Sequence, residues 1–164
     1  MGQLIQQRKI QFFCLTDGVQ FSEMADCLIC PKCSRKIIKK NNVYNFIDKK
    51  TGNSEIWNNI FENGIDKVGI LKRIFDRLLL KFLPDLLNDY IISYVLNQYS
   101  ENAKLIELGC GEATVSRSLL QKKNYAITLL DFSDVGLRKA VNYLKKEGKI
   151  ERVTFIKDDL NSKK

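Results

Sequence analysis

Apolar and polar positions change along residues 104–156 in blocks that predict strands and helices in turn. The short apolar runs at 104–108, 126–130 and 153–156 are of the right length for buried strands. The stretches between them carry apolar residues three and four positions apart, which predicts amphipathic helices. Short strand–helix–strand connections require right-handed crossovers. We therefore expect an α/β fold, a Rossmann-like doubly wound parallel sheet that is incomplete and contains the first three strands.

Two further regions precede this sheet. Residues 51–100 carry a helical pattern that Pro84 interrupts, so a helical connector is expected there. In residues 1–50, Asn41-Asn42 lies between two short β-prone runs, which is typical of a hairpin. The chain accordingly divides into a small β-rich module at 1–50, a connector at 51–100 and half of an α/β domain at 101–164.

Composition fits this division and limits where the protein acts. Apolar residues make up 45% and charged residues 28% of the 164 positions, as in ordinary soluble domains. No apolar run reaches the roughly 18 residues of a membrane span, so none is expected. The N-terminus lacks the apolar core of a signal peptide. A cytoplasmic protein is the expectation.

The net charge of +8 is uneven along the chain. Residues 1–50 hold nine Lys/Arg and four Asp/Glu, so they carry +5 of the total. A basic region of this kind can attract RNA or an anionic surface, although an ordinary solvated face explains it as well. The chain has no histidine, which excludes imidazole as a catalytic base or a metal ligand.

Four of the five cysteines fall in the first 33 residues. Cys30-Pro31-Lys32-Cys33 has the form of a zinc knuckle, in which two thiolates hold one side of a tetrahedral ion. The nearby Cys14 and Cys27 are the candidates to complete the site, although the spacing between them is long for a second knuckle. The sequence therefore predicts zinc bound by Cys14, Cys27, Cys30 and Cys33, with a metal-free ribbon as an equal alternative. An iron–sulfur cluster and a disulfide are less favoured.

The candidate chemistry of the sheet lies where its strands end. The first strand runs into the tight turn Gly109-Cys110-Gly111, and parallel strands place all their carboxyl ends at one edge. The residues expected at this edge are Glu107, Gly109, Gly111, Asp131, Phe132, Asp158 and Asp159. Three acidic strand ends on one edge are hard to explain by packing alone, so we expect a ligand there.

Charge decides which ligand fits this edge. Glu107 and Glu112 flank the glycine turn and would repel the pyrophosphate of a dinucleotide. The sulfonium and amino groups of S-adenosylmethionine are cationic, and these carboxylates would attract them. Asp131 follows Gly109 by 22 residues, which is the right reach for the ribose hydroxyls. Phe132 is placed to stack on the adenine ring.

The motifs at 107–113, 129–133 and 155–160 together resemble the class I S-adenosylmethionine-dependent methyltransferases. The resemblance implies that Glu107 faces the methionine amino end and that Gly109 and Gly111 face the cofactor backbone. It also places Asp131 at the ribose and Asp159 at the adenine ring. The family has a third glycine where this chain has Ala113, a change that we expect to be tolerated. Residues 25–50 resemble the zinc-ribbon-like domains that are fused to, or partnered with, methyltransferases.

The expected function is S-adenosylmethionine-dependent methyl transfer to an unidentified acceptor, which is a small molecule, RNA or protein. No catalytic residue is assigned. The family fold needs roughly seven strands, so the chain resembles an N-terminal fragment whose activity alone is in doubt. The missing strands predict association through an unpaired sheet edge. The alternative is a non-catalytic binding module whose basic N-terminal ribbon recruits RNA or a protein partner.

Overall fold

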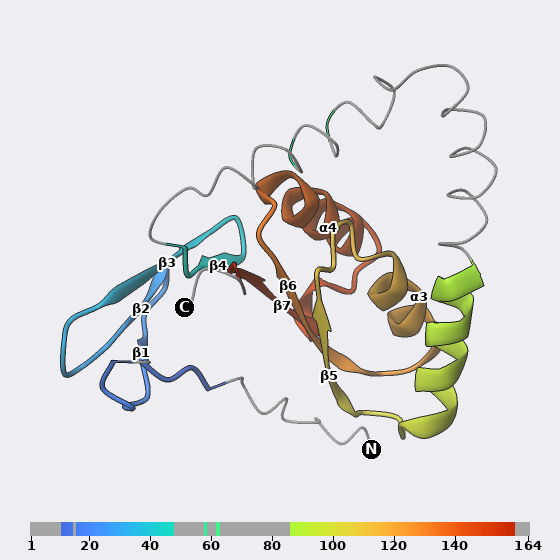
Figure 1. Cartoon of the computed structure of the whole chain (residues 1–164), viewed down its shortest axis with the longest axis horizontal. Coiled ribbons are helices and arrows are strands. Elements are labelled where there is room, and N and C mark those ends of the chain that lie inside the picture. The colour runs from blue at the N-terminus through green and yellow to red at the C-terminus, as the bar shows by residue number, and fades with distance from the viewer. Residues whose placement is uncertain (1–10, 15, 48–57, 59–61, 63–85, 160–164) are drawn as a thin grey trace.

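A single seven-stranded sheet runs through the computed structural model, which describes residues 11–14, 16–47, 58, 62 and 86–159. The strand order is β1-β2-β3-β4-β7-β6-β5 (Figure 1). The strands are β1 (Ser22–Glu23), β2 (Cys27–Ile29), β3 (Lys36–Lys40), β4 (Val43–Asn45), β5 (Lys104–Leu108), β6 (Ala126–Asp131) and β7 (Val153–Lys157). The labelled helices are α3 (Thr114–Lys122) and α4 (Asp134–Lys146), and a 3-10 turn, η1 (Ile150–Arg152), precedes β7.

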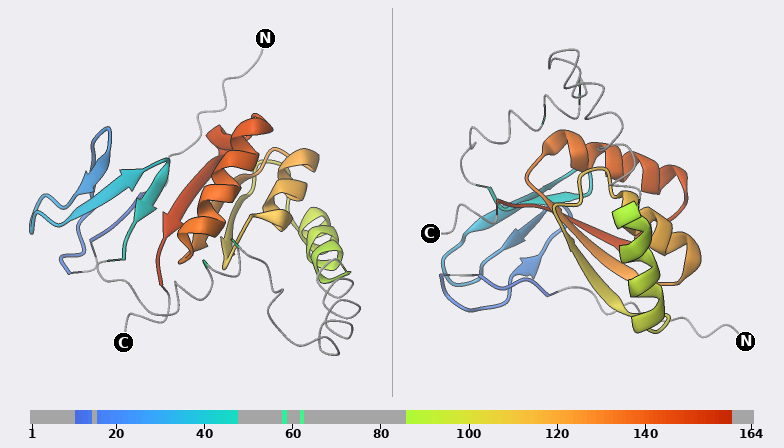
Figure 2. Two further views of the ribbon diagram at one scale, coloured as in Figure 1. Left: turned by 90° about the horizontal axis from the view of Figure 1, so that it is seen from above. Right: turned by 45° about the vertical axis from the view of Figure 1, so that its right-hand side comes forward.

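The predicted half-sheet is confirmed. β5, β6 and β7 are parallel neighbours, and the expected strands agree with the observed ones to within one residue at their ends. The facing positions Glu107, Leu129 and Phe155 are in register across the three strands. Leu129 and Phe155 are buried in one cluster with apolar residues of both α3 and α4, so the two helices cover the same face of the sheet (Figure 2).

The residues at the ends of α3 and α4 explain where these helices begin and end. Ser133 caps α4 because its hydroxyl accepts a hydrogen bond from Gly136 N at 3.1 Å. Gly148 follows the end of α4 with a φ of +65°, the left-handed conformation that often ends a helix. Ala113 precedes α3 with a φ of 61° and is fully buried. Ala113 therefore adopts the left-handed conformation that a glycine takes at lower cost.

The N-terminal module forms an antiparallel sheet, β1 to β4, as expected of a small β-rich unit. The predicted hairpin is confirmed: β3 and β4 are joined by Asn41 and Asn42, with φ of 50° and 67°. Two positive φ values are typical of the two-residue turn that fits the twist of a hairpin, and asparagine tolerates them. A separate apolar cluster, which includes Phe21, Leu28 and Ile37, forms the core of this module.

The module and the half-domain share the sheet. β4 pairs in parallel with β7, with Tyr44 opposite Ile156, and Phe46 N donates to Lys157 O at 2.8 Å. Figure 2 shows β1 to β4 continuing the sheet beyond β7. The sequence predicted the two parts but not this contact between them. The boundary predicted at residue 50 and most of the predicted connector lie outside the described residues.

Residues 86–98 are helical and belong to the predicted connector. Ile92 is buried, and Val95 and Leu96 pack against the core of the half-domain. Lys123 Nζ donates to the carbonyl of Tyr99 at 2.8 Å, which ties the end of this segment to the end of α3. None of the helices in the described part of the chain has the length and apolarity needed to cross a membrane.

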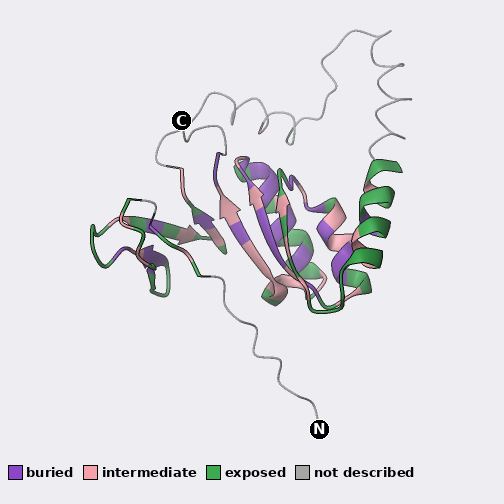
Figure 3. Cartoon of the chain, turned by 60° about the horizontal axis from the view of Figure 1, so that its bottom comes forward, coloured by how far each residue is buried: buried purple, intermediate pink, exposed green. Residues whose placement is uncertain are grey.

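The far edge of the sheet is β5, which has no second strand neighbour among the described residues. Ile106 is 71% exposed and Leu108 is 60% exposed, and they alternate along β5 with Leu105, which packs against the core shared with α3 and α4. Figure 3 shows buried residues, in purple, on both the strands and the helices of this half-domain. Association through this edge stays a prediction. We expect the sedimentation coefficient of the chain to rise with concentration, and the rise to be smaller after Ile106→Lys. A concentration-independent sedimentation coefficient would contradict it.

Candidate functional site

The glycine turn after β5 is bonded to the end of β6. Gly109 and Gly111 have φ of 70° and 51°, a region that favours glycine. Gly109 N donates to Leu130 O at 2.8 Å and Cys110 N donates to the same carbonyl at 3.2 Å. The turn therefore has a fixed position relative to the carboxyl ends of β5 and β6.

Asp131, the last residue of β6, accepts hydrogen bonds from both the glycine turn and the residue that caps α4. Its Oδ2 accepts from Gly111 N at 2.8 Å and its Oδ1 accepts from Ser133 N at 2.8 Å. The residue is 5% exposed. The sequence predicted a ribose-binding role for Asp131, and the structure adds that its carboxylate holds the glycine turn and the start of α4. Each carboxylate oxygen keeps a second lone pair for a ligand hydroxyl.

Glu107 lies on the face of β5 that is turned toward α3. Its carboxylate accepts a hydrogen bond from Ser116 Oγ of α3. Burial raises the pKa of Glu107, and the charge of Asp131 raises it further. Two carboxyl groups thus lie near the turn, and the charge of Asp131 makes ionisation of Glu107 less favourable. This edge is electrostatically suited to a cation.

Cys110 lies between the two glycines and is buried. Burial raises the pKa of its thiol, and the charges of Asp131 and Glu107 raise it further. The thiol is therefore protonated at neutral pH, which argues against a nucleophilic role.

Glu112 differs from Glu107 in having a cationic partner. Lys139 Nζ of α4 lies 2.7 Å from Glu112 Oε1. This ion pair compensates the Glu112 charge, so the argument against a pyrophosphate rests on Glu107 and Asp131 and no longer on Glu112. Glu107 and Asp131 are therefore the carboxylates that favour a cation over a pyrophosphate at this turn.

The third strand end lies beside the second. Asp158 N donates to Asp131 O at 3.1 Å, and Asp159 N donates to Asp158 Oδ1 at 3.0 Å. Asp158 and Asp159 are 6% and 8% exposed, and Phe132 is partly buried. The structure therefore brings the predicted residues to one edge of the sheet, at the carboxyl ends of β5, β6 and β7.

Three residues of this edge were not found from the sequence. Ser116 bonds Glu107, as described above, and Asn58 Oδ1 accepts from Ser133 Oγ at 2.8 Å and from Val135 N at 3.3 Å. Gly136 lies so close to the turn that an added Cβ would be 3.1 Å from Gly111 O. A glycine inside a helical pattern signals such an approach. No comparable signal marks Asn58, which lies 75 residues from Ser133.

Gly136→Ala tests the contact between α4 and the glycine turn. Alanine favours a helix by about 1 kcal/mol over glycine, but its Cβ would press on Gly111. If the turn binds the cofactor that the motifs predict, we expect little net change in thermal stability and a roughly tenfold loss of affinity for S-adenosylhomocysteine in calorimetric titration. Arg138→Ala on the exposed side of α4 is the control, with unchanged affinity expected. Equal affinities of the two variants would contradict a role for this contact.

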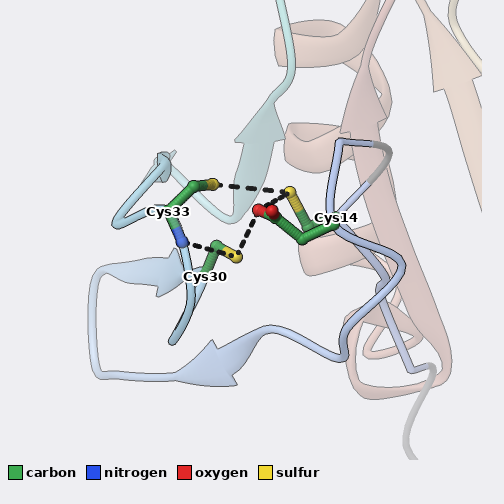
Figure 4. Close-up of side chains that lie close together, drawn as sticks. Cys14, Cys30 and Cys33 are labelled. Atoms are coloured by element: carbon green, nitrogen blue, oxygen red, sulfur yellow. Dashed lines mark hydrogen bonds between the residues drawn. The ribbon is translucent and has the colours of Figure 1, made fainter.

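A second candidate site lies in the N-terminal module. Cys14, Asp17, Cys30 and Cys33 place their ligand atoms within 4.8 Å of one another, a grouping that can hold a metal ion. Figure 4 shows the three cysteine side chains converging. The Sγ atoms of Cys14 and Cys33 are 3.7 Å apart. Hydrogen bonding to the Asp17 carboxylate raises the pKa of Cys33 to about 12, and the same contact lowers the pKa of Asp17.

Cys27, the remaining predicted ligand, is not in this group. It begins β2, where it pairs with Ile38 of β3, and it is buried. Successive residues of a strand point to opposite faces, so Cys27 points away from the face on which Leu28 packs in one cluster with Cys30. The spacing between Cys14 and Cys27 is long for a second knuckle because these two cysteines do not lie together. Cys14 and Cys30 belong to one cluster, with Leu28, and Cys27 does not.

The βαβαβ unit and its glycine turn define a Rossmann-like α/β half-domain. Solved structures similar to this chain include S-adenosylmethionine-dependent methyltransferases, the family that its motifs resemble. No protein-family model and no curated protein matches the sequence.

One such structure is a protein of Methanococcus maripaludis assigned as an S-adenosyl-L-methionine-dependent methyltransferase: 18% identity over 69% of this chain and 45% of that protein, TM-score 0.42. A methyltransferase of Geobacter sulfurreducens, solved with S-adenosyl-L-homocysteine, is 22% identical over 44% of this chain and 28% of its own, TM-score 0.38. The cyclase SpnF is 22% identical over 43% and 27%, TM-score 0.40. This chain thus spans less than half the length of each protein.

Proposed function

We propose that this chain binds S-adenosylmethionine at the carboxyl ends of β5, β6 and β7 and serves methyl transfer to an acceptor. The observation that supports the proposal is the pairing of Glu107 and Asp131 around the glycine turn. The pKa of Glu107 is raised by burial and by Asp131, so a cationic ligand placed between them would relieve an unfavourable charge arrangement. S-adenosylmethionine carries two cationic groups.

The proposed contacts follow the order of the strands. Glu107 accepts from the methionine amino group, and the backbone of Gly109 and Gly111 allows the cofactor to approach closely. Asp131 accepts from the ribose hydroxyls with the lone pairs that remain after its two backbone hydrogen bonds. Phe132 stacks on the adenine ring. Asp158 and Asp159 bind the adenine amino group.

Methyl transfer is a displacement at the sulfonium methyl, and positioning of the two reactants supplies much of its acceleration. The described residues supply the cofactor half of this arrangement. The acceptor and its binding residues are not assigned, and no general base is proposed. The alternative of a non-catalytic module that recruits RNA or a protein through its basic ribbon is not favoured.

Calorimetric titration of the chain with S-adenosylhomocysteine tests the proposal, because this product of methyl transfer lacks the methyl group and the sulfonium charge but keeps the cationic amino group and adenosine. We expect one site per chain. Titration with NAD, whose pyrophosphate would lie near Glu107 and Asp131, is the matched comparison, with no binding expected. Binding of NAD in preference to S-adenosylhomocysteine, or of neither compound by the folded chain, would overturn the proposal.

A further inference from the structure

We propose that Cys14, Asp17, Cys30 and Cys33 form a closed tetrahedral zinc site in which Asp17 is the fourth ligand. The site lies in the N-terminal module, apart from the glycine turn. It differs from the four-cysteine site expected from the sequence, because a carboxylate takes the place that was given to Cys27.

The backbone forms the same pattern of hydrogen bonds around each of the two ligand pairs. Cys14 O accepts from Gly18 N at 2.8 Å and Cys14 N donates to Val19 O at 2.8 Å. The same two bonds recur sixteen residues later around Cys30, whose O accepts from Ser34 N at 3.0 Å and whose N donates to Arg35 O at 2.8 Å. The backbone therefore forms two equivalent turns, one at each ligand pair.

The equivalence extends to the residues that close the turns. Gly18 and Ser34 both have positive φ, 67° and 62°. Asp17 and Cys33 precede them and so occupy matching positions, three residues after Cys14 and Cys30. Asp17 thus holds the place of the second cysteine in a Cys-x-x-Cys knuckle. Zinc accepts carboxylate oxygen as well as thiolate sulfur.

Distances between the ligand atoms fit one small cation. Zinc bonds of about 2.3 Å to sulfur and about 2.1 Å to oxygen place tetrahedral ligands about 3.8 Å apart for two sulfurs and about 3.6 Å apart for sulfur and oxygen. Cys14 Sγ and Cys33 Sγ are 3.7 Å apart. Asp17 Oδ2 lies 3.5 Å from Cys14 Sγ and 3.4 Å from Cys30 Sγ.

The second oxygen of Asp17 supports a role as a single-oxygen ligand. Lys32 Nζ lies 3.8 Å from Asp17 Oδ1, whereas Oδ2 is the oxygen near the sulfurs of Cys14 and Cys30. A cation beside the outer oxygen orients the carboxylate and compensates part of the negative charge of three thiolates and one carboxylate. Cys33 N also lies 3.5 Å from Cys30 Sγ, as a backbone donor to a knuckle thiolate would.

The site would join the first described segment of the chain to the sheet. Cys14 lies next to Phe13, which forms an isolated bridge with Gln20, whereas Cys30 follows β2 directly. Since β4 pairs with β7, the fold that the metal stabilises borders the strand that leads to Asp158 and Asp159. Binding free energy of a structural zinc ion is largely folding free energy.

Metal content of the reduced chain after loading with zinc and gel filtration tests the assignment. We expect one zinc per chain for the native sequence and for Cys27→Ser, and a loss of at least 100-fold in zinc affinity for Cys30→Ser and Asp17→Ala, measured against a competing chelator. Zinc-free native chain, or a loss after Cys27→Ser as large as after Cys30→Ser, would overturn the proposal. Zinc retained at native affinity by Asp17→Ala would overturn the role of Asp17.

Asp17→Cys provides a second test that does not depend on removing a ligand. This variant should bind the metal through four cysteines, so it should stay folded where the other variants unfold. With cobalt(II) in place of zinc, the sulfur-to-metal absorption should rise by about a third as four thiolates replace three. An unchanged absorption per bound cobalt would show that residue 17 does not reach the metal. This readout is independent of S-adenosylhomocysteine binding, so it can succeed or fail separately from the proposed function.

Discussion

Asp131→Ala is expected to abolish measurable binding of S-adenosylhomocysteine and to lower the free energy of unfolding by about 3 kcal/mol. The carboxylate accepts from two backbone amides, Gly111 N and Ser133 N, in a position that is 5% exposed. Removing it leaves two buried donors unsatisfied, each at a cost of about 1–3 kcal/mol. Chemical denaturation and calorimetric titration measure the two effects.

Asp134→Ala is the matched control for this prediction. Asp134 is three residues away, its side chain is 62% exposed, and it pairs with Lys157 at 2.6 Å. The carboxylate end of this pair is exposed, and ion pairs at the surface contribute little, so we expect a change below about 1 kcal/mol and unchanged binding. If Asp131→Ala kept native affinity while folded, the carboxylate would hold the turn but not contact the ligand. If its stability were also unchanged, the hydrogen bonds from Gly111 N and Ser133 N to this carboxylate would contribute little free energy.

The local elements of the half-domain could be predicted from the sequence because their determinants are local. The apolar run at 104–108 and the helical spacing after Ser133 each depend on a few neighbouring residues. The Asn41-Asn42 turn is a similar case, since two adjacent residues that tolerate positive φ specify the hairpin. Parallel pairing then follows from the short connections.

The pairing of β4 with β7 could not be predicted in this way. It joins residues more than 100 positions apart, such as Tyr44 and Ile156, through backbone groups that every sequence possesses. The contact of Asn58 with the start of α4 could not be predicted either, because it also joins residues that are far apart in the sequence. Periodicity reports which face of an element is buried, but it does not report which edge of a sheet another strand will join.

Asp17 illustrates a different limit. The sequence contains Cys14-x-x-Asp17 and Cys30-x-x-Cys33 at equal spacing, so the signal was present. A search for cysteine alone selects Cys27 as the fourth ligand, because it is close in sequence. The alternation of side chains in β2 argues against Cys27 as a ligand, because it places Cys27 on the face opposite Leu28, which packs with Cys30. If Asp17 binds the metal as we propose, equal spacing within two turns is a better guide to this site than the number of cysteines.

Glu107→Gln is expected to change stability and binding in opposite directions. Burial and the charge of Asp131 raise the pKa of Glu107 above the ordinary value of a glutamate, so its ionised form is disfavoured in the folded state. The free energy of unfolding of the native chain therefore falls as pH rises from about 4.5 through the raised pKa. Glutamine cannot ionise and still accepts from Ser116 Oγ, so the variant should have the higher Tm at pH 7.

The same substitution removes the anion proposed to bind the methionine amino group. We expect a 10- to 100-fold weaker affinity for S-adenosylhomocysteine, since a hydrogen bond to a charged group contributes about 1.5–3 kcal/mol. Glu112→Gln is the control, because Lys139 already compensates Glu112, and it should keep its affinity and gain no stability. A Glu107→Gln variant with lower Tm and native affinity would show that this carboxylate is a structural acceptor for Ser116, and the cation preference of the turn would then rest on Asp131 alone.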